Sequence, residues 1–80
     1  MVYKIERSNG DARAAASKKS AIATARRMLG VSRVYRGAEY QTDRPGDGGD
    51  RESCYALDIW GSRKMAAEVS GQPADVVISW

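Results

Sequence analysis

An 80-residue chain with one cysteine has to fold around a single small hydrophobic core, without an intrachain disulfide to reinforce it. A chain of this length is one domain and buries only about 60% of the surface that its unfolded state exposes. We therefore expect one domain over residues 1–80 with a small margin of stability. The absence of disulfides and of an apolar signal segment is typical of a cytoplasmic protein. No apolar stretch reaches the roughly 20 residues that a membrane span needs.

The clearest local pattern predicts an amphipathic helix over residues 18–29. Ser17 suits its N-cap and Gly30 its C-cap. Apolar side chains that should face a sheet recur at helical spacing: Ala21, Ile22, Ala25, Met28 and Leu29. The opposite, solvent-facing side should carry six other residues of the helix: Lys19, Ser20, Ala23, Thr24, Arg26 and Arg27.

Period-two alternation predicts strands on both sides of this helix. Residues 2–7 form the first, and Asn9-Gly10 is a turn signal. Residues 12–16 fit either a returning strand or the start of a helix. Residues 33–41 form the next strand, with Gly37 as a candidate bulge.

The second half of the chain repeats this pattern with a shorter helix. Residues 54–60 are predicted as a strand whose core side carries Tyr55, Leu57 and Ile59. Gly61-Ser62 then leads either into another strand or into a short helix over residues 63–70. Val76-Val77-Ile78 forms the last strand, which ends at Trp80. The expected fold class is α+β. It has about four mainly antiparallel strands, one main helix, a short second helix, and the ferredoxin-like βαββαβ order favoured.

Residues 43–53 are rich in glycine and aspartate and are predicted to form a flexible loop. Their acidic residues do not follow the spacing of a calcium-binding EF-hand loop. The chain contains no histidine, which removes the commonest general base and the commonest zinc ligand. Cys54 has no CxxC partner and is interpreted as a small apolar filler. We expect no catalytic residue, no metal and no cofactor, so the protein should not be an enzyme.

Charge is distributed unevenly along the chain. Residues 1–40 carry nine Lys/Arg and three Asp/Glu, whereas residues 41–80 carry four and seven. No acidic residue lies between Ala12 and Ala38, a stretch that contains seven basic ones: Arg13, Lys18, Lys19, Arg26, Arg27, Arg33 and Arg36. A merely solvated face normally mixes both signs of charge, so this stretch favours a contact surface for phosphates or for an acidic protein.

The residues predicted to contact a partner are therefore basic, together with one exposed tryptophan: Lys18, Lys19, Arg26, Arg27, Arg33, Arg36 and Trp60. Arginine forms bidentate contacts with phosphate and carboxylate groups. An exposed tryptophan is a frequent interface anchor, although Trp60 could equally lie under a helix.

Taken together, the strand at residues 3–7, the helix ending in Arg26-Arg27-Met28-Leu29-Gly30, the strand around Val34-Tyr35-Arg36 and the segment 55–60 resemble the small phage-borne anti-CRISPR proteins. The resemblance is to inhibitors of type I, and specifically type I-C, effector complexes. It implies a stoichiometric binder of effector (Cascade) subunits, monomeric or homodimeric, that blocks target-DNA recruitment in the bacterial cytoplasm. Many such inhibitors are acidic DNA mimics, and the basic first half of this chain departs from that pattern. The alternative function is a small basic nucleic-acid-binding module.

Overall fold

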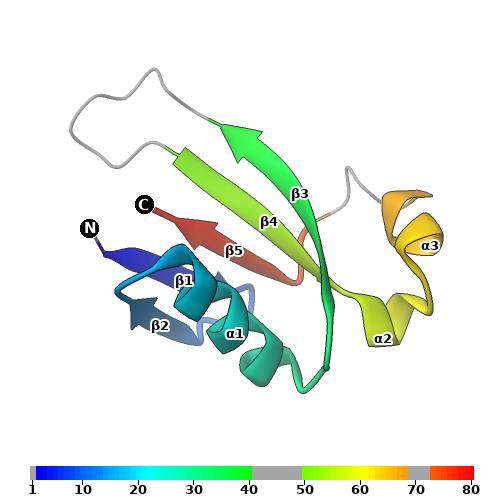
Figure 1. Cartoon of the computed structure of the whole chain (residues 1–80), viewed down its shortest axis with the longest axis horizontal. Coiled ribbons are helices and arrows are strands. Elements are labelled where there is room, and N and C mark those ends of the chain that lie inside the picture. The colour runs from blue at the N-terminus through cyan, green and yellow to red at the C-terminus, as the bar shows by residue number, and fades with distance from the viewer. Residues whose placement is uncertain (1, 41–49, 69–72) are drawn as a thin grey trace.

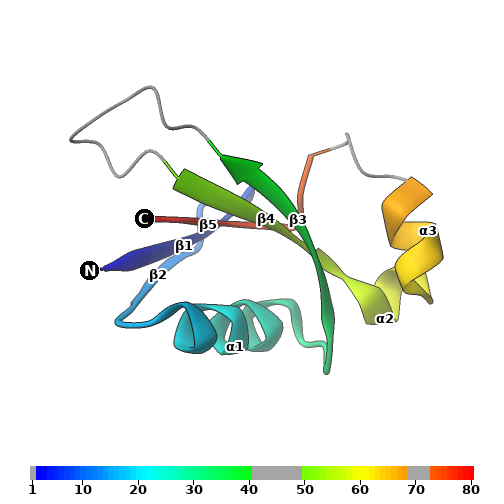
Figure 2. The same cartoon turned by 45° about the horizontal axis from the view of Figure 1, so that its top comes forward.

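Five antiparallel strands form one sheet, and the longest helix packs on one of its faces (Figure 1). The computed structural model describes residues 2–40, 50–68 and 73–80. The elements follow the chain as β1 (Tyr3–Arg7), β2 (Ala12–Ala15), α1 (Lys18–Leu29), β3 (Val34–Tyr40), β4 (Asp50–Ala56), α2 (Leu57–Trp60), α3 (Arg63–Glu68) and β5 (Val76–Ser79). The turned view in Figure 2 shows α1 lying along the sheet, while α2 and α3 stand beyond one end of it. No helix in the described ranges is long and apolar enough to cross a membrane.

The α+β class is confirmed, but the described sheet has five strands where about four were expected, and the ferredoxin-like order is wrong. The strands lie side by side as β2-β1-β5-β4-β3, with every neighbouring pair antiparallel. The difference begins at the first turn, where the chain folds back as β2 and does not enter α1 directly. Gly10 has a φ of 93°, and the Asp11 backbone N–H donates to Asn9 Oδ1 over 2.9 Å. This turn sets Tyr3 opposite Ala15 and makes residues 12–15 an edge strand.

Helix α1 begins and ends at the predicted caps. The backbone N–H of Ser20 donates to Ser17 Oγ over 3.1 Å, and Gly30 takes the left-handed conformation with a φ of 69°. The side that meets the sheet is centred on small residues, because Ala21 and Ala25 are fully buried. The remaining apolar residues of the predicted stripe are half-buried: Ile22, Met28 and Leu29.

Thr24 was expected on the exposed side of α1 and is instead buried. Its hydroxyl donates to the backbone carbonyl of Ser20 over 2.9 Å, which satisfies the polar group inside the helix. The helix is thus rotated about its axis relative to the prediction, so that two alanines and a threonine make the close contact with the strands. Such small side chains allow a helix to approach a sheet more closely than a leucine-lined stripe would.

The core lies between α1 and the middle strands. Fully buried Ile5 and Ile78 are opposite each other on β1 and β5, and Cys54 and Val76 form the equivalent pair on β4 and β5. Tyr3 and Trp80 close one end of this core, with their ring centroids 5.5 Å apart.

The prediction of a strand over residues 54–60 is wrong at both ends. Strand β4 already begins at Asp50, so residues 50–53 of the predicted loop are strand, while residues 43–49 lie outside the described residues. It ends at Ala56, which pairs with Val34 at the start of β3, and one further backbone bond runs from the Leu57 N–H to the Arg33 carbonyl over 3.3 Å. Residues 57–60 form α2, which leaves Ile59 68% exposed.

Two smaller predictions have different outcomes. Gly37 is not a bulge, because it pairs with Ser53 in an unbroken register. A Cβ at this position would lie 3.4 Å from Tyr55 Cε2, close to ordinary van der Waals contact. The helical alternative after Gly61-Ser62 is confirmed over residues 63–68 as α3, while residues 69–70 lie outside the described residues. The Met65 backbone N–H donates to Ser62 Oγ over 3.2 Å.

Candidate binding groove

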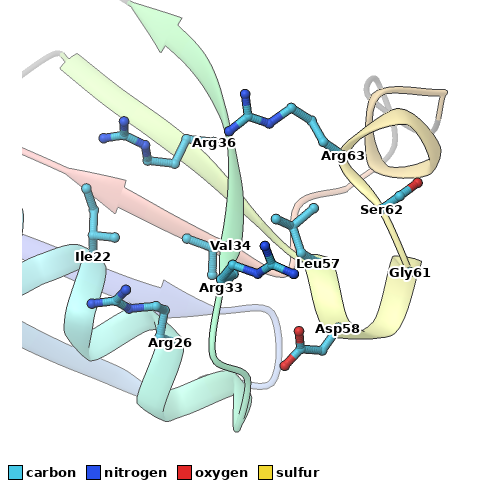
Figure 3. Close-up of a pocket in the computed structure, with 10 residues that line it drawn as sticks. All are labelled: Ile22, Arg26, Arg33, Val34, Arg36, Leu57, Asp58, Gly61, Ser62 and Arg63. Atoms are coloured by element: carbon cyan, nitrogen blue, oxygen red, sulfur yellow. The ribbon is translucent and has the colours of Figure 1, made fainter.

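A groove of about 930 Å³ runs along the start of β3, between the second half of α1 and the α2–α3 segment (Figure 3). We call it the arginine groove, because four guanidinium groups line it: Arg26, Arg33, Arg36 and Arg63. Its apolar lining comes from three elements: Ile22 of α1, Val34 of β3 and Leu57 of α2. Asp58, Gly61 and Ser62 complete the wall.

The four arginines reach the groove from separate parts of the fold. Figure 3 shows Arg26 and Arg36 on one side of β3, and Arg33 and Arg63 on the other. The strand register explains this division. Arg36 lies opposite core residue Cys54 and therefore projects on the α1 face, whereas Arg33 precedes β3 at the opposite parity. Arg63 is brought in by the turn that joins α2 to α3.

Little negative charge offsets these arginines. Asp58 is the acidic residue among those that line the groove, and its Oδ2 already accepts hydrogen bonds from the backbone N–H and the hydroxyl of Ser32, over 2.9 and 3.2 Å. Among the described residues, no carboxylate forms an ion pair with Arg26, Arg33 or Arg63. These guanidinium groups are therefore available to an anionic partner.

Arg36 is the exception, because it shares a buried carboxylate with Lys18. Its Nε lies 3.7 Å from Glu52 Oε1, and Lys18 Nζ lies 3.0 Å from Glu52 Oε2. The Glu52 side chain is only 6% exposed, so both cations are held close to the sheet. Lys18 Nζ also lies 4.9 Å from the centroid of the Trp80 ring. The position of Lys18 in the first turn of α1, where the helix dipole disfavours a cation, is thus explained by structural contacts.

Of the seven predicted contact residues, the structure brings three together: Arg26, Arg33 and Arg36. Lys18 belongs to the Glu52 ion pair, and Lys19 is exposed on the first turn of α1 outside the groove. Arg27 lies on the other side of α1 beside Arg13, with its Nη2 donating to Thr24 Oγ1 over 3.2 Å.

Trp60 also lies outside the groove and has a structural contact. Its Nε1–H donates to Asp75 Oδ2 over 3.4 Å, and the same carboxylate oxygen accepts from the Ala56 backbone N–H over 2.9 Å. This bond ties α2 to the end of β4 and the approach to β5. Arg63 is a groove residue that no sequence pattern marks, because only the fold of the α2–α3 segment brings it there.

Cys54 is fully buried under α1. Burial, with a smaller contribution from the negative charge of Glu52, raises the pKa of Cys54 from 9.0 to about 12. Since the thiolate is the reactive form, this thiol should be inert while the protein is folded.

We expect Cys54 to react slowly with a disulfide-exchange reagent at pH 8 in the native protein and promptly after unfolding in urea. The same raised pKa stabilises the fold below pH 9, and we expect that contribution to be lost as the pH rises from 9 towards 12. Absorbance of the released chromophore measures the first effect, and urea unfolding at pH 8 and pH 10.5 measures the second. Prompt reaction in the folded protein would contradict the burial of this residue.

Within the described ranges, no three acidic or cysteine side chains gather as a metal-binding cluster. Comparisons with protein-family models, with curated proteins and with solved structures give no match to this chain, so the groove is interpreted from its own geometry.

Proposed function

We propose that this protein is a non-enzymatic binding protein that inhibits a type I CRISPR-Cas effector complex, with the arginine groove contacting an acidic surface of an effector subunit and so blocking target-DNA recruitment. The observation that supports a binding role is the groove itself, with four arginines and one acid whose carboxylate is already hydrogen-bonded. The choice of an effector as the partner rests on the sequence resemblance.

The chemistry of the groove fits the recognition of anionic groups. Guanidinium groups bind carboxylates through paired N–H···O bonds, and aliphatic side chains between them provide apolar area for a protein surface. Ile22, Val34 and Leu57 supply that area here. Since the whole chain carries a net charge of only +3, we expect charge to guide association with a defined acidic partner and not to drive general binding to DNA.

The test compares the two partner classes directly. We expect the protein to co-elute with a purified type I-C effector in size-exclusion chromatography, and that effector to lose capture of its target DNA. A gel-shift series with duplex DNA at about 0.15 M salt, where the Debye length is about 8 Å, should show no retained complex. The nucleic-acid-binding alternative would be favoured if the protein bound DNA tightly and formed no complex with the effector. The logarithm of the DNA-binding constant should then fall with the logarithm of the salt concentration, with a slope of about −0.9 per phosphate contact.

A further inference from the structure

We propose that β3 accepts an extended acidic segment of the partner protein as a sixth strand of the sheet, with the carboxylates of that segment lying in the arginine groove. This inference rests on the proposed function to the extent that the partner is a protein. It adds the mode of binding, which is strand addition, and the class of segment that is bound.

The first observation is the free edge of β3. In the order β2-β1-β5-β4-β3 this strand is the last, and it pairs with β4 over all seven of its residues, Val34–Tyr40. No other described element pairs with it, so its outer edge presents unpaired backbone N–H and C=O groups. The opposite edge strand, β2, has only four residues. An exposed edge of this length can receive an extended peptide by main-chain hydrogen bonding.

The second observation is that the arginines gather around the start of this same strand. Arg26 and Arg36 lie on the α1 side of β3, and Arg33 and Arg63 on the α2–α3 side (Figure 3). Side chains of an added strand would alternate between the two faces of the sheet. Acidic side chains on the α1 face would meet Arg26 and Arg36, and acidic side chains near the start of β3 would meet Arg33 and Arg63. Apolar side chains of the same segment would meet Val34 or Leu57.

Glu52 has a positioning role in this arrangement. It holds Arg36 through Nε, which leaves the two terminal nitrogens of the guanidinium group outside that ion pair. The parity of β3 places Arg36 on the groove side of the sheet, and this ion pair reduces the side-chain freedom that Arg36 would lose on binding a partner.

The free edge of β3 and the nearby arginines together favour a protein segment over a nucleic acid as the bound partner. Phosphates would satisfy the guanidinium groups but would not match the regular row of donors and acceptors along β3. An extended acidic peptide satisfies both, since its backbone pairs with the edge and its carboxylates accept from the arginines.

The experiment uses a synthetic ten-residue peptide of repeating Val-Val-Glu-Glu, in which each face of the extended strand carries both residue types. We expect this peptide to bind the full chain in fluorescence anisotropy. Two changes should each weaken binding by at least about tenfold: N-methylation of alternate backbone amides, and replacement of every glutamate by lysine. Amide hydrogen exchange should show new protection at alternate residues of β3, and none in β2.

Loss of affinity on Glu-to-Lys replacement, but none on N-methylation, would overturn strand addition and leave a purely electrostatic groove. No binding of the parent peptide, together with an intact effector complex, would overturn the inference while the proposed function stands. If the effector does not bind but the peptide does, with β3 protected, the proposed partner is wrong and the strand-addition site is retained.

Discussion

Replacing Ile78 with alanine is expected to lower the free energy of unfolding by about 2–5 kcal/mol, which is a large part of the stability of a domain this small. Ile78 is fully buried on β5, opposite Ile5 on one neighbouring strand and Glu52 on the other. The substitution removes apolar contacts at the centre of the sheet, where the backbone is fixed on both sides and cannot collapse into the cavity. Urea unfolding followed by circular dichroism measures the change.

The matched control is the same substitution at Ile59, whose side chain lies on α2 and is 68% exposed. We expect this change to remain within about 0.5 kcal/mol, because it removes little buried surface. Leu57, which the alternating pattern placed in the core, is half-buried and should fall between the two isoleucines. Equal destabilisation at Ile78 and Ile59 would show that residues 57–60 continue β4 into the core and do not form α2.

These isoleucines also show how far local pattern predicts this fold. The ends of α1 could be predicted because Ser17 and Gly30 act locally, through hydrogen bonds and backbone conformation that their own side chains determine. The alternation of Tyr55, Leu57 and Ile59 is equally regular, but a strand also needs a partner. The pairing of β4 with β3 ends at Ala56 opposite Val34, and only the Leu57 N–H bond to the Arg33 carbonyl continues it.

The contacts that turn the chain after β4 come from distant residues. Asp75 accepts from the Ala56 backbone N–H and from Trp60 Nε1, and Asp58 accepts from the Ser32 backbone N–H and hydroxyl. These separations of 15 to 26 residues leave no periodic signal in the sequence. Local patterns in the sequence therefore predict the α+β class but neither the strand order nor α2.

The candidate site was predicted in part for the same reason. A run of basic residues without acids marked Arg26, Arg33 and Arg36, and these do line one groove. The same run also contained Lys18, whose partner is Glu52 of β4, and Arg27, which lies on the other side of α1. Counting basic and acidic residues along the sequence cannot separate these roles. The basic run between Ala12 and Ala38 also does not contain Arg63, which enters the groove only because α2 turns the chain back.

Reversing two groove charges is expected to abolish most partner binding without unfolding the protein. In the double variant Arg33→Glu, Arg63→Glu, we expect affinity for the type I-C effector to fall at least about 30-fold, equivalent to about 2 kcal/mol. Both side chains are exposed, and neither forms an ion pair within the described part of the chain. Arg63 also begins α3, where an acidic residue interacts more favourably with the helix dipole than a basic one. A loss of binding with an unchanged melting temperature would therefore reflect the groove and not the fold.

A control variant tests whether the location of the reversed charges matters or only the net charge of the protein. This control is the double variant Arg13→Glu, Lys19→Glu. It changes the total charge by the same amount, but Arg13 lies on β2 beyond α1 and Lys19 on the first turn of the helix, both outside the groove. Screening at about 0.15 M salt limits the influence of charges farther than about 8 Å from the contact, so this variant should bind with an affinity within about threefold of that of the parent protein.

Titration calorimetry with purified effector compares the affinities of the parent protein and the two double variants in the same buffer. If both double variants lose affinity equally, binding follows the overall charge of the chain, and the arginine groove has no special role. If only the groove variant loses affinity, the partner surface must lie along β3 between α1 and the α2–α3 segment.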